Sequence, residues 1–273
     1  MTAGAGPGRV GLLGLPWDGS SSFRRGPARA PAAIREALRS EAHNGWSETG
    51  IVVLAPELLS DLGDLTLTED AASVREAIRA GVAELPARGL RPLLLGGDHS
   101  VTLPVLRALR PEFPRLQVLH IDAHPDLYPD FQGDRFSHAC PFARAFEEGL
   151  IDGLVQVGIR TLNAVQQGQA ERFGVKILRP EAWHGPLPLD PTMPVYLSLD
   201  MDGIDPAFAP GVSHREPGGL SVRETIAVLG RIPAPLIGAD LVELNPDTDL
   251  DGVTAVVAAK LIREIVARLV ERG

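Results

Sequence analysis

The chain has 273 residues, of which 44% are hydrophobic and 22% charged, as in a globular protein with one large α/β domain or two small ones. The formal charge is −9, no Lys/Arg run occurs and no apolar run reaches the roughly 18 residues of a membrane span, so neither nucleic acid nor a membrane is an expected partner. The single cysteine, Cys140, excludes an internal disulfide and a Cys-rich zinc site, and MTAGAGPGR lacks a signal-peptide pattern, so we expect a cytoplasmic enzyme or binding protein.

Short apolar runs recur along the chain and predict about eight strands. Several runs are apolar at successive positions, which is typical of strands covered on both faces, as in a parallel sheet. The predicted strands are Val10–Gly14, Ile51–Leu54, Pro92–Leu95, Gln117–Ile121, Leu154–Gly158, Val175–Leu178, Val195–Leu199 and Leu236–Ala239.

Amphipathic segments lie between these strands. Ala30–Arg39 follows a Pro/Gly-rich turn, Asp70–Leu85 opens with acidic residues, and Gly252–Arg272 has apolar residues at helical spacing. No repeat and no linker divides the chain. The alternation predicts a single three-layer αβα domain, residues 1–273, with a mostly parallel sheet of about eight strands.

Chemically active side chains follow four of the predicted strands. In a parallel α/β sheet, ligands bind beyond the carboxyl ends of the strands. The four stretches are GGDHS at 96–100, HIDAHPDLYPD at 120–130, DMDGIDPAFAPG at 200–211 and DLVELNPDTD from 240. They contain His99, then Asp122, His124 and Asp126, then Asp200 and Asp202, and finally Asp240 and Glu243.

Charge balance predicts a metal centre at this edge. Unpaired buried carboxylates cost several kcal/mol each, and two divalent cations would neutralise four of them. A mixed His/carboxylate set favours Mn²⁺, Fe²⁺ or Zn²⁺ over Ca²⁺ or Mg²⁺. Two such ions can supply hydroxide from a shared water near neutral pH. Each stretch alone is compatible with a turn or a hydrogen-bonded acidic cluster; the ordered combination is far more specific.

The stretches GGDHS, DAHPD and SLDMDGIDPAFAPG resemble the three signature motifs of the ureohydrolases, the arginase–agmatinase family. The likeness extends to GLPWDGSSSFRRGPARAPAAIR, to DLGD at 61–64 and to VELNPDTDLDGVTAVVAAKLIRE, and therefore spans nearly the whole chain. The stretches SHACPFARA and PGVSHREPGGLS look most like plant-type arginases.

The resemblance implies an arginase/deacetylase-like fold and two Mn²⁺ per chain. A hydroxide between the metals would attack the guanidinium carbon and give urea and an amine. In the family pattern Asp122 and Asp200 bridge the two metals. The implied ligands are His99, Asp122, His124, Asp126, Asp200 and Asp202.

Three residues are implied in catalysis. Glu243 matches the glutamate that holds the guanidinium, and a planar guanidinium pairs well with a carboxylate. His138 matches the histidine that shuttles a proton to the leaving amine. Asp126 is counted as catalytic as well as a ligand. Glu243 could also be a salt-bridged surface residue, but VELNP follows a strand whose end faces the cluster, which favours the site. Without the resemblance, His138 reads as an ordinary histidine at a helix start.

The resemblance fixes the substrate less closely than the metals. The plant-type likeness favours L-arginine, with agmatine and other guanidino acids such as 4-guanidinobutyrate as alternatives. Arg135 is a candidate partner of a substrate carboxylate, although a solvated loop arginine fits the sequence as well. Tyr128, Asp130 and Ser137 are further candidates in the same loop. For His214, the sequence is equally compatible with a contact to the substrate and with no such contact.

Other function classes stay open at this point. A deacetylase-like amide hydrolase would hold one zinc, and a non-catalytic family member would be expected to have lost a ligand; no ligand is lost here. The family forms trimers or hexamers, which implies a homo-oligomer. We interpret His120 as a core histidine, Cys140 as a packing residue, and Asp98, Asp205 and Asp240 as turn residues or partners that orient the ligands.

Overall fold

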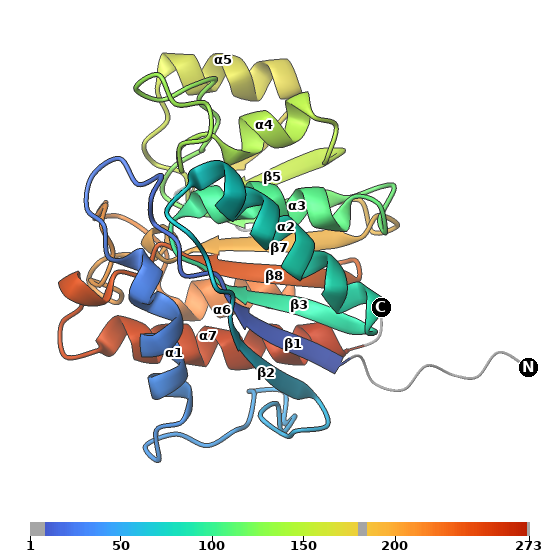
Figure 1. Ribbon diagram of the computed structural model, residues 1–273, viewed down its shortest axis with the longest axis vertical. Coiled ribbons are helices and arrows are strands. Elements are labelled where there is room, and N and C mark those ends of the chain that lie inside the picture. Colours follow the sequence, from blue (N-terminus) through green and yellow to red (C-terminus); the bar gives the residue numbers. More distant parts are fainter. Residues whose placement is uncertain (1–8, 180–184, 272–273) are drawn as a thin grey trace, which may run out of the picture.

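The structure is a computed structural model that describes residues 9–179 and 185–271. Its centre is an eight-stranded sheet in the order β2-β1-β3-β8-β7-β4-β5-β6, in which every pair of neighbours is parallel (Figure 1). The strands are β1 (Arg9–Gly14), β2 (Leu59–Asp64), β3 (Leu90–Leu95), β4 (Gln117–Ile121), β5 (Gly153–Val157), β6 (Lys176–Leu178), β7 (Val195–Asp200) and β8 (Leu236–Val242).

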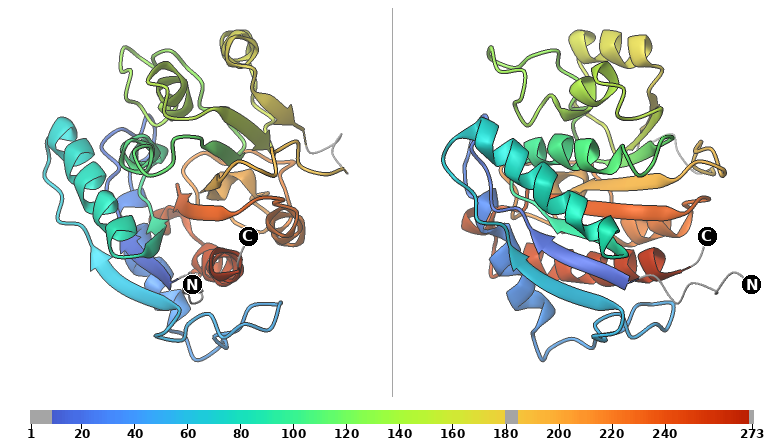
Figure 2. Two further views of the ribbon diagram at one scale, coloured as in Figure 1. Left: turned by 90° about the vertical axis from the view of Figure 1, so that its right-hand side faces the viewer. Right: turned by 45° about the vertical axis from the view of Figure 1, so that its right-hand side comes forward.

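Helices cover both faces of the sheet, which confirms the predicted single three-layer domain (Figure 2). One face packs against α1 (Ala30–Leu38), α6 (Val222–Gly230) and α7 (Val253–Val270). The other packs against α2 (Ala71–Ala87), α3 (Thr102–Leu109), α4 (Pro141–Glu147) and α5 (Ala164–Phe173). Four short 3₁₀ turns complete the described elements: η1 (Pro27–Arg29), η2 (His99–Val101), η3 (Met201–Gly203) and η4 (Pro246–Thr248).

The central strands are buried on both faces, as their continuous apolar runs predict. In β3, Leu93 and Leu95 belong to one core and Leu94 to the other. All three side chains are fully shielded from solvent. Successive strand residues point to opposite sides of the sheet, so a run without alternation needs an apolar layer on each side.

One predicted strand is wrong. Ile51–Leu54 forms a turn region with a single antiparallel bridge between Trp46 and Val52, and the edge strand β2 lies further along, at Leu59–Asp64. The β2 sequence LSDLGD is half polar because the strand pairs on one side only, with β1. An edge strand of this kind lacks the apolar run by which the other strands are found.

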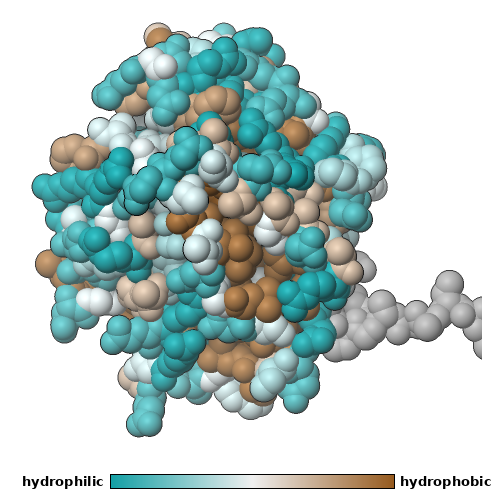
Figure 3. All heavy atoms as spheres, viewed as in Figure 1, coloured by the Kyte–Doolittle hydropathy of each residue, from teal (hydrophilic) through white to brown (hydrophobic). Residues whose placement is uncertain are grey.

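Helix α7 packs over the first core through Leu261, Ile265 and Leu269, which are fully buried. The predicted helix was longer, and its last residue, Arg272, lies outside the described residues. Val253 and Val256, two of its predicted apolar positions, are 42% and 38% exposed. Figure 3 shows a mostly hydrophilic surface on the face viewed in Figure 1, with apolar side chains gathered near its middle. Within the described chain, no helix combines the length and apolar character needed to cross a membrane.

Candidate active site

Four neighbouring strands bring the predicted residues to one edge of the sheet. In the order β3, β8, β7 and β4, these strands are the middle of the sheet, and all run in the same direction. His99 follows β3, Glu243 follows β8, Asp200 ends β7, and Asp122 follows β4. Segments far apart in the sequence therefore converge beyond the carboxyl ends of the strands, where ligands bind in such folds.

His99 faces three carboxylates. Its Nδ1 atom lies 3.1 Å from Asp126 Oδ2, 3.2 Å from Asp122 Oδ2 and 3.3 Å from Asp200 Oδ2. The His99 side chain is fully buried, and Nδ1 has no hydrogen-bond partner. A buried ring nitrogen without a partner costs free energy, so a ligand at this position would satisfy it.

His124 faces the other side of the same cluster. Its Nδ1 atom lies 3.1 Å from Asp202 Oδ2 and 3.4 Å from Asp122 Oδ1. The two oxygens of Asp122 thus face different histidines, as a carboxylate shared between two cations would require. Asp200 Oδ1 accepts the backbone N–H of Asp202 at 2.8 Å, which leaves Oδ2 toward His99.

Burial makes this cluster unfavourable without a cation. Burial and repulsion by Asp202 and Asp122 raise the pKa of Asp200 well above its ordinary value. Burial also raises the pKa of Asp202 to about 6, against the attraction of His124. For His99, burial alone would lower the pKa, but the surrounding carboxylates raise it well above its ordinary value. Unpartnered Nδ1 and four crowded carboxylates fit divalent cations coordinated by nitrogen and oxygen.

A buried relay orients His99. His99 Nε2 lies 2.9 Å from Ser198 Oγ, and this hydroxyl donates to Asp240 Oδ1 at 2.7 Å. Asp240 Oδ2 accepts hydroxyl hydrogens from Tyr196 and Thr102, both at 2.8 Å. Because Nε2–H donates to Ser198, Nδ1 can offer a lone pair to a cation held among the carboxylates. The sequence analysis names Asp240 but misses Ser198, whose polarity within an apolar strand, at the same parity as Asp200, was the available signal.

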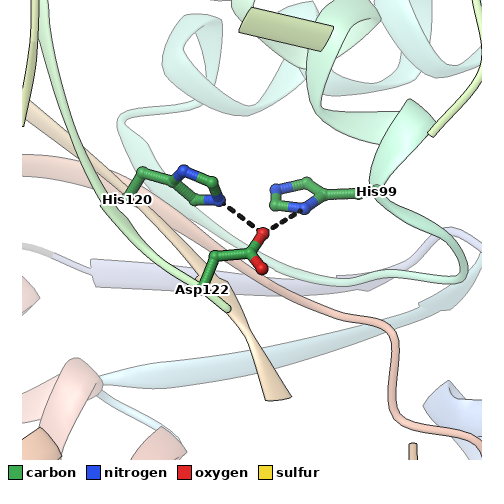
Figure 4. A group of neighbouring side chains, drawn as sticks. All are labelled: His99, His120 and Asp122. Atoms are coloured by element: carbon green, nitrogen blue, oxygen red, sulfur yellow. Dashed lines mark hydrogen bonds and ion pairs between the residues drawn. The ribbon is translucent and has the colours of Figure 1, made fainter. Parts of the chain in front are cut away.

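His120 is a satisfied core histidine, as predicted. Figure 4 shows its ring and that of His99 reaching the same Asp122 carboxylate. His120 Nε2 lies 2.7 Å from Asp122 Oδ2, and its Nδ1 lies 2.9 Å from Gln156 Nε2. Both ring nitrogens therefore have protein partners, and His120 holds the shared carboxylate in place.

Backbone geometry at the strand ends positions the ligands. A Cβ at Gly97 would lie 1.6 Å from the Trp17 carbonyl oxygen, so the turn before His99 accepts only glycine. Asp126 and Glu243 adopt positive φ angles of 51° and 63°, which non-glycine residues rarely do. Such left-handed residues are characteristic of functional sites, where surrounding contacts hold them.

Glu243 and His138 form a pair beside the metal-ligating cluster. Glu243 Oε1 lies 2.8 Å from His138 Nδ1 and accepts the backbone N–H of His99 at 2.9 Å. Glu243 is 3% exposed, and its Oε2 atom is buried without a hydrogen-bond partner. On the far side of the ring, His138 Nε2 lies 2.8 Å from Ser22 Oγ and 3.2 Å from the Ser22 backbone nitrogen.

The pair shifts both pKa values toward the charged forms. Burial alone would lower the pKa of His138, but the Glu243 carboxylate raises it to about 9. Burial would likewise raise the pKa of Glu243, but the His138 imidazole lowers it. His138 therefore carries a proton at neutral pH next to the cluster, a property that suits a general acid.

Comparisons with known proteins identify the family. The family model described as "Arginase family" matches residues 8–267. Arginase 1, mitochondrial, of Arabidopsis thaliana is 43% identical over 94% of this chain and 80% of its own length. The solved arginase from Medicago truncatula superimposes with a TM-score of 0.88 at 38% identity, covering 97% of this chain and 89% of that one. The chain belongs to the arginase family.

Membership of the arginase family confirms the predicted resemblance and makes the protein an enzyme, a hydrolase of the ureohydrolase type. The guanidinopropionase of Pseudomonas aeruginosa is a further relative, 36% identical over 96% of this chain and 87% of its own length. The family match removes the deacetylase-like alternative.

The comparisons contradict the cytoplasmic location predicted from composition. Plant relatives at 40–43% identity are named as mitochondrial, or as chloroplastic and mitochondrial. The prediction rested on the single cysteine, on the stretch MTAGAGPGR and on the lack of a long apolar run, and none of these separates the cytoplasm from the interior of an organelle.

A cavity opens over the cluster of this arginase-family chain. Seven predicted site residues line it or the cluster at its base: His124, Asp126, His138, Asp200, Asp202, His214 and Glu243. His99 and Asp122 lie beneath them, fully buried. The remaining lining residues are uncharged, and most were not singled out from the sequence: Ser22, Tyr128, Phe131, Ala139, Thr161 and Gln166.

Some predicted substrate contacts lie elsewhere. Arg135 is 61% exposed, pairs with Glu147 at 2.9 Å and does not line the cavity, so it is a solvated loop arginine and not a carboxylate partner. Ser137 is buried, and its hydroxyl accepts the backbone N–H of Ala139, away from the cavity. Asp130 caps a loop turn at Gly133.

Other polar residues play the supporting parts expected of them. Asp98 accepts hydrogen bonds from Ser20 and Ser21 and so ties the N-terminal loop to η2. Asp205 accepts three backbone N–H groups in the loop that follows η3. Cys140 is buried, and burial raises the pKa of its thiol to about 12, so it packs as a small apolar residue.

Proposed function

We propose that this arginase-family enzyme hydrolyses L-arginine to L-ornithine and urea with two Mn²⁺ ions. The observation that carries the proposal is Glu243, whose buried Oε2 has no partner and whose side chain lines the cavity beside the metal-ligating cluster. A guanidinium group presents N–H donors in a plane and would satisfy that oxygen. The plant arginases among its relatives support arginine as the substrate.

Six residues would hold the metals. His99 and Asp126 would bind one ion and His124 and Asp202 the other, with Asp122 and Asp200 shared. When bound, the two ions would lower the pKa of a water between them far enough to supply hydroxide near neutral pH. The mixture of imidazole and carboxylate ligands supports Mn²⁺, which such sites favour over Mg²⁺ or Ca²⁺.

The protein groups around the cluster orient the substrate and move the proton. Glu243 would fix the guanidinium with its carbon toward the six ligands. His138 would donate its proton to the leaving amine, because Glu243 keeps the imidazole protonated through a pKa of about 9. Ser22 would hold the ring in place from the other side.

The uncharged part of the cavity supports arginine over the alternatives. Beyond the cluster and its histidines, the lining side chains such as Tyr128, Thr161 and Gln166 carry no charge. The far end of arginine bears one ammonium and one carboxylate and has no net charge. Agmatine would place a lone ammonium there and 4-guanidinobutyrate a lone carboxylate, each without an opposite partner on the wall.

The remaining proposals concern the whole chain. Residues 1–273 would form one catalytic domain that assembles into a homo-oligomer, a trimer or hexamer. Leu250, just before α7, and Val253 and Val256 at its start are exposed apolar side chains that support such a contact. Light scattering of the wild type and of Val256→Glu would test this contact. The same mass for the two proteins would exclude this patch as the interface.

Urea release tests the reaction. The manganese-loaded protein is assayed with L-arginine, agmatine and 4-guanidinobutyrate side by side, with Glu243→Gln as the control variant. A clear preference for L-arginine that is lost in Glu243→Gln supports the proposal. A preference for another guanidino compound would change the substrate, and no urea from any of them would refute the function.

A further inference from the structure

The cavity holds a second group of metal-ligating side chains, distinct from the six proposed ligands. One ligand atom from each of His138, His214 and Glu243 lies within 4.8 Å of the others. The His138 and His214 rings have centroids 5.3 Å apart, and all three side chains line the cavity. No role in the proposed reaction requires His214.

Two observations indicate that this group can accept a cation. Glu243 is buried, with an exposed fraction of 3%, and its Oε2 atom has no hydrogen-bond partner within the described chain. His138 Nε2 lies 2.8 Å from Ser22 Oγ and accepts the Ser22 backbone N–H at 3.2 Å, so Ser22 holds the ring on the side away from Glu243. Ligating histidines usually have such an outer partner, because it fixes the tautomer and the ring orientation.

We propose that His138, His214 and Glu243 form an inhibitory Zn²⁺ site at the mouth of the active site. Zn²⁺ binds imidazole nitrogen and carboxylate oxygen, and a site with three protein ligands keeps a fourth position for water. Two divalent ions would balance the four aspartates of the main centre, and release of the His138 proton would make the charge of Glu243 available to a third ion.

Binding of this zinc would block the proposed reaction. The ion would take the place of the proton between His138 and Glu243, so the general acid would be lost. It would also occupy the carboxylate that holds the guanidinium, so zinc and substrate would compete. The competition rests on the proposed function, whereas zinc binding itself does not.

Zinc binding is measured on the protein that already holds two manganese ions per chain. After dialysis against micromolar zinc chloride, elemental analysis is expected to find one added zinc with manganese retained. Zinc-edge X-ray absorption of the same sample is expected to detect two imidazole ligands. His214→Asn should weaken zinc binding by more than about tenfold, since it removes a direct ligand, and His43→Asn, outside the cavity, should not.

Three outcomes would overturn the site: zinc that replaces manganese one for one, fewer than two imidazoles on zinc, or equal zinc affinity in wild type and His214→Asn. The absorption measurement needs no variant, so it decides the matter even where His214→Asn fails to fold. Urea release without a third metal would refute the zinc site alone. A third metal on a protein that releases no urea would refute the proposed reaction alone.

Discussion

Ser198 links His99 to Asp240, and its hydroxyl is the only acceptor of the His99 Nε2–H in the described structure. Ser198→Ala removes this acceptor, so the ring loses its fixed tautomer and orientation. We expect the manganese held by His99 to bind about 10–100-fold more weakly, with less effect on the other ion. Titration of the metal-free variant with Mn²⁺, followed by electron paramagnetic resonance, measures both steps.

Tyr196→Phe is the matched control for this variant. It removes a hydroxyl from the same Asp240 carboxylate but leaves the contact between Ser198 and His99 intact. Manganese affinity should therefore stay close to that of the wild type. Equal losses in the two variants would mean that Asp240 acts on the cluster by its charge and not through the serine.

The paired residues Glu243 and His138 give a second prediction. In the metal-free protein His138 should titrate with a pKa of about 9, and Glu243→Gln should lower that pKa by more than one unit. Because the folded pKa of His138 lies above its ordinary value of 6.5 and that of Glu243 lies below its ordinary value of 4.5, this pair stabilises the fold fully between pH 4.5 and 6.5. The stabilisation is lost as the pH rises through 9.

Nuclear magnetic resonance of the histidine ring protons measures this titration directly. The His43 signal serves as an internal reference, because His43 lies outside the cavity. An unchanged His138 titration in Glu243→Gln would exclude the carboxylate as the cause of the raised pKa.

Individual residues differ in how far the sequence determines them. Asp122, His124 and Asp126 were found because they follow a buried run, and the fold brings them together with His99. Ser22 was missed because it meets His138 across 116 residues, a contact that only the tertiary fold creates. Arg135 was misassigned because the local sequence does not distinguish a loop arginine that pairs with Glu147 from one that binds a substrate carboxylate.

The turn between β3 and η2 is the element on which the histidine ligand depends. In Gly97→Ala the new Cβ would meet the Trp17 carbonyl at 1.6 Å, a backbone atom that cannot turn aside. We expect destabilisation by roughly 1–3 kcal/mol, the range for an overpacked site, together with weaker metal binding as His99 is displaced. Thermal unfolding and manganese titration measure the two effects.

Gly168→Ala in α5 is the appropriate comparison. A Cβ at Gly168 meets nothing within 4 Å, so alanine should be tolerated or should stabilise by about 0.5–1 kcal/mol through its higher helix propensity. If the unfolding temperature of Gly97→Ala is not lower than that of Gly168→Ala, the turn can shift further than the Trp17 contact implies.

The bounds of buried strands were predicted more accurately than those of the edge strand. Fully buried strands such as β4 and β7 were placed almost to the residue, because both faces demand apolar side chains. The edge strand β2 was placed several residues too early, because only one side of it is paired and its sequence is half polar. The hydrophobic pattern of a sequence reflects burial, and it does not show directly which strands are hydrogen-bonded to each other.

At the scale of the molecule, metal binding and folding stability should be linked. Burial raises the pKa of Asp202 to about 6 and that of Asp200 well above its ordinary value, so ionising the cluster in the metal-free protein opposes folding near neutral pH. Below the ordinary carboxylate pKa this penalty disappears. Added Mn²⁺ should therefore raise Tm more at pH 7.5 than at pH 5, where protons compete with the metal.

Calorimetry of chelator-treated protein with and without Mn²⁺ checks this dependence. The variant Asp200→Asn should show a smaller increase in Tm at pH 7.5, since one ionised ligand is lost. The same rise in Tm at both pH values would mean that the metals bind without displacing protons from the cluster.

The position of β8 in the sheet has a consequence for how the protein is made. β8 lies between β3 and β7, yet it follows both in the chain. During synthesis the earlier strands leave the ribosome as two separate sets, each with an unpaired, apolar inner edge. Such edges are prone to aggregate, so the nascent chain needs shielding until residues 236–242 emerge. The strand that joins the halves also positions Glu243, so the carboxylate proposed to bind the guanidinium is in place only when the sheet is complete.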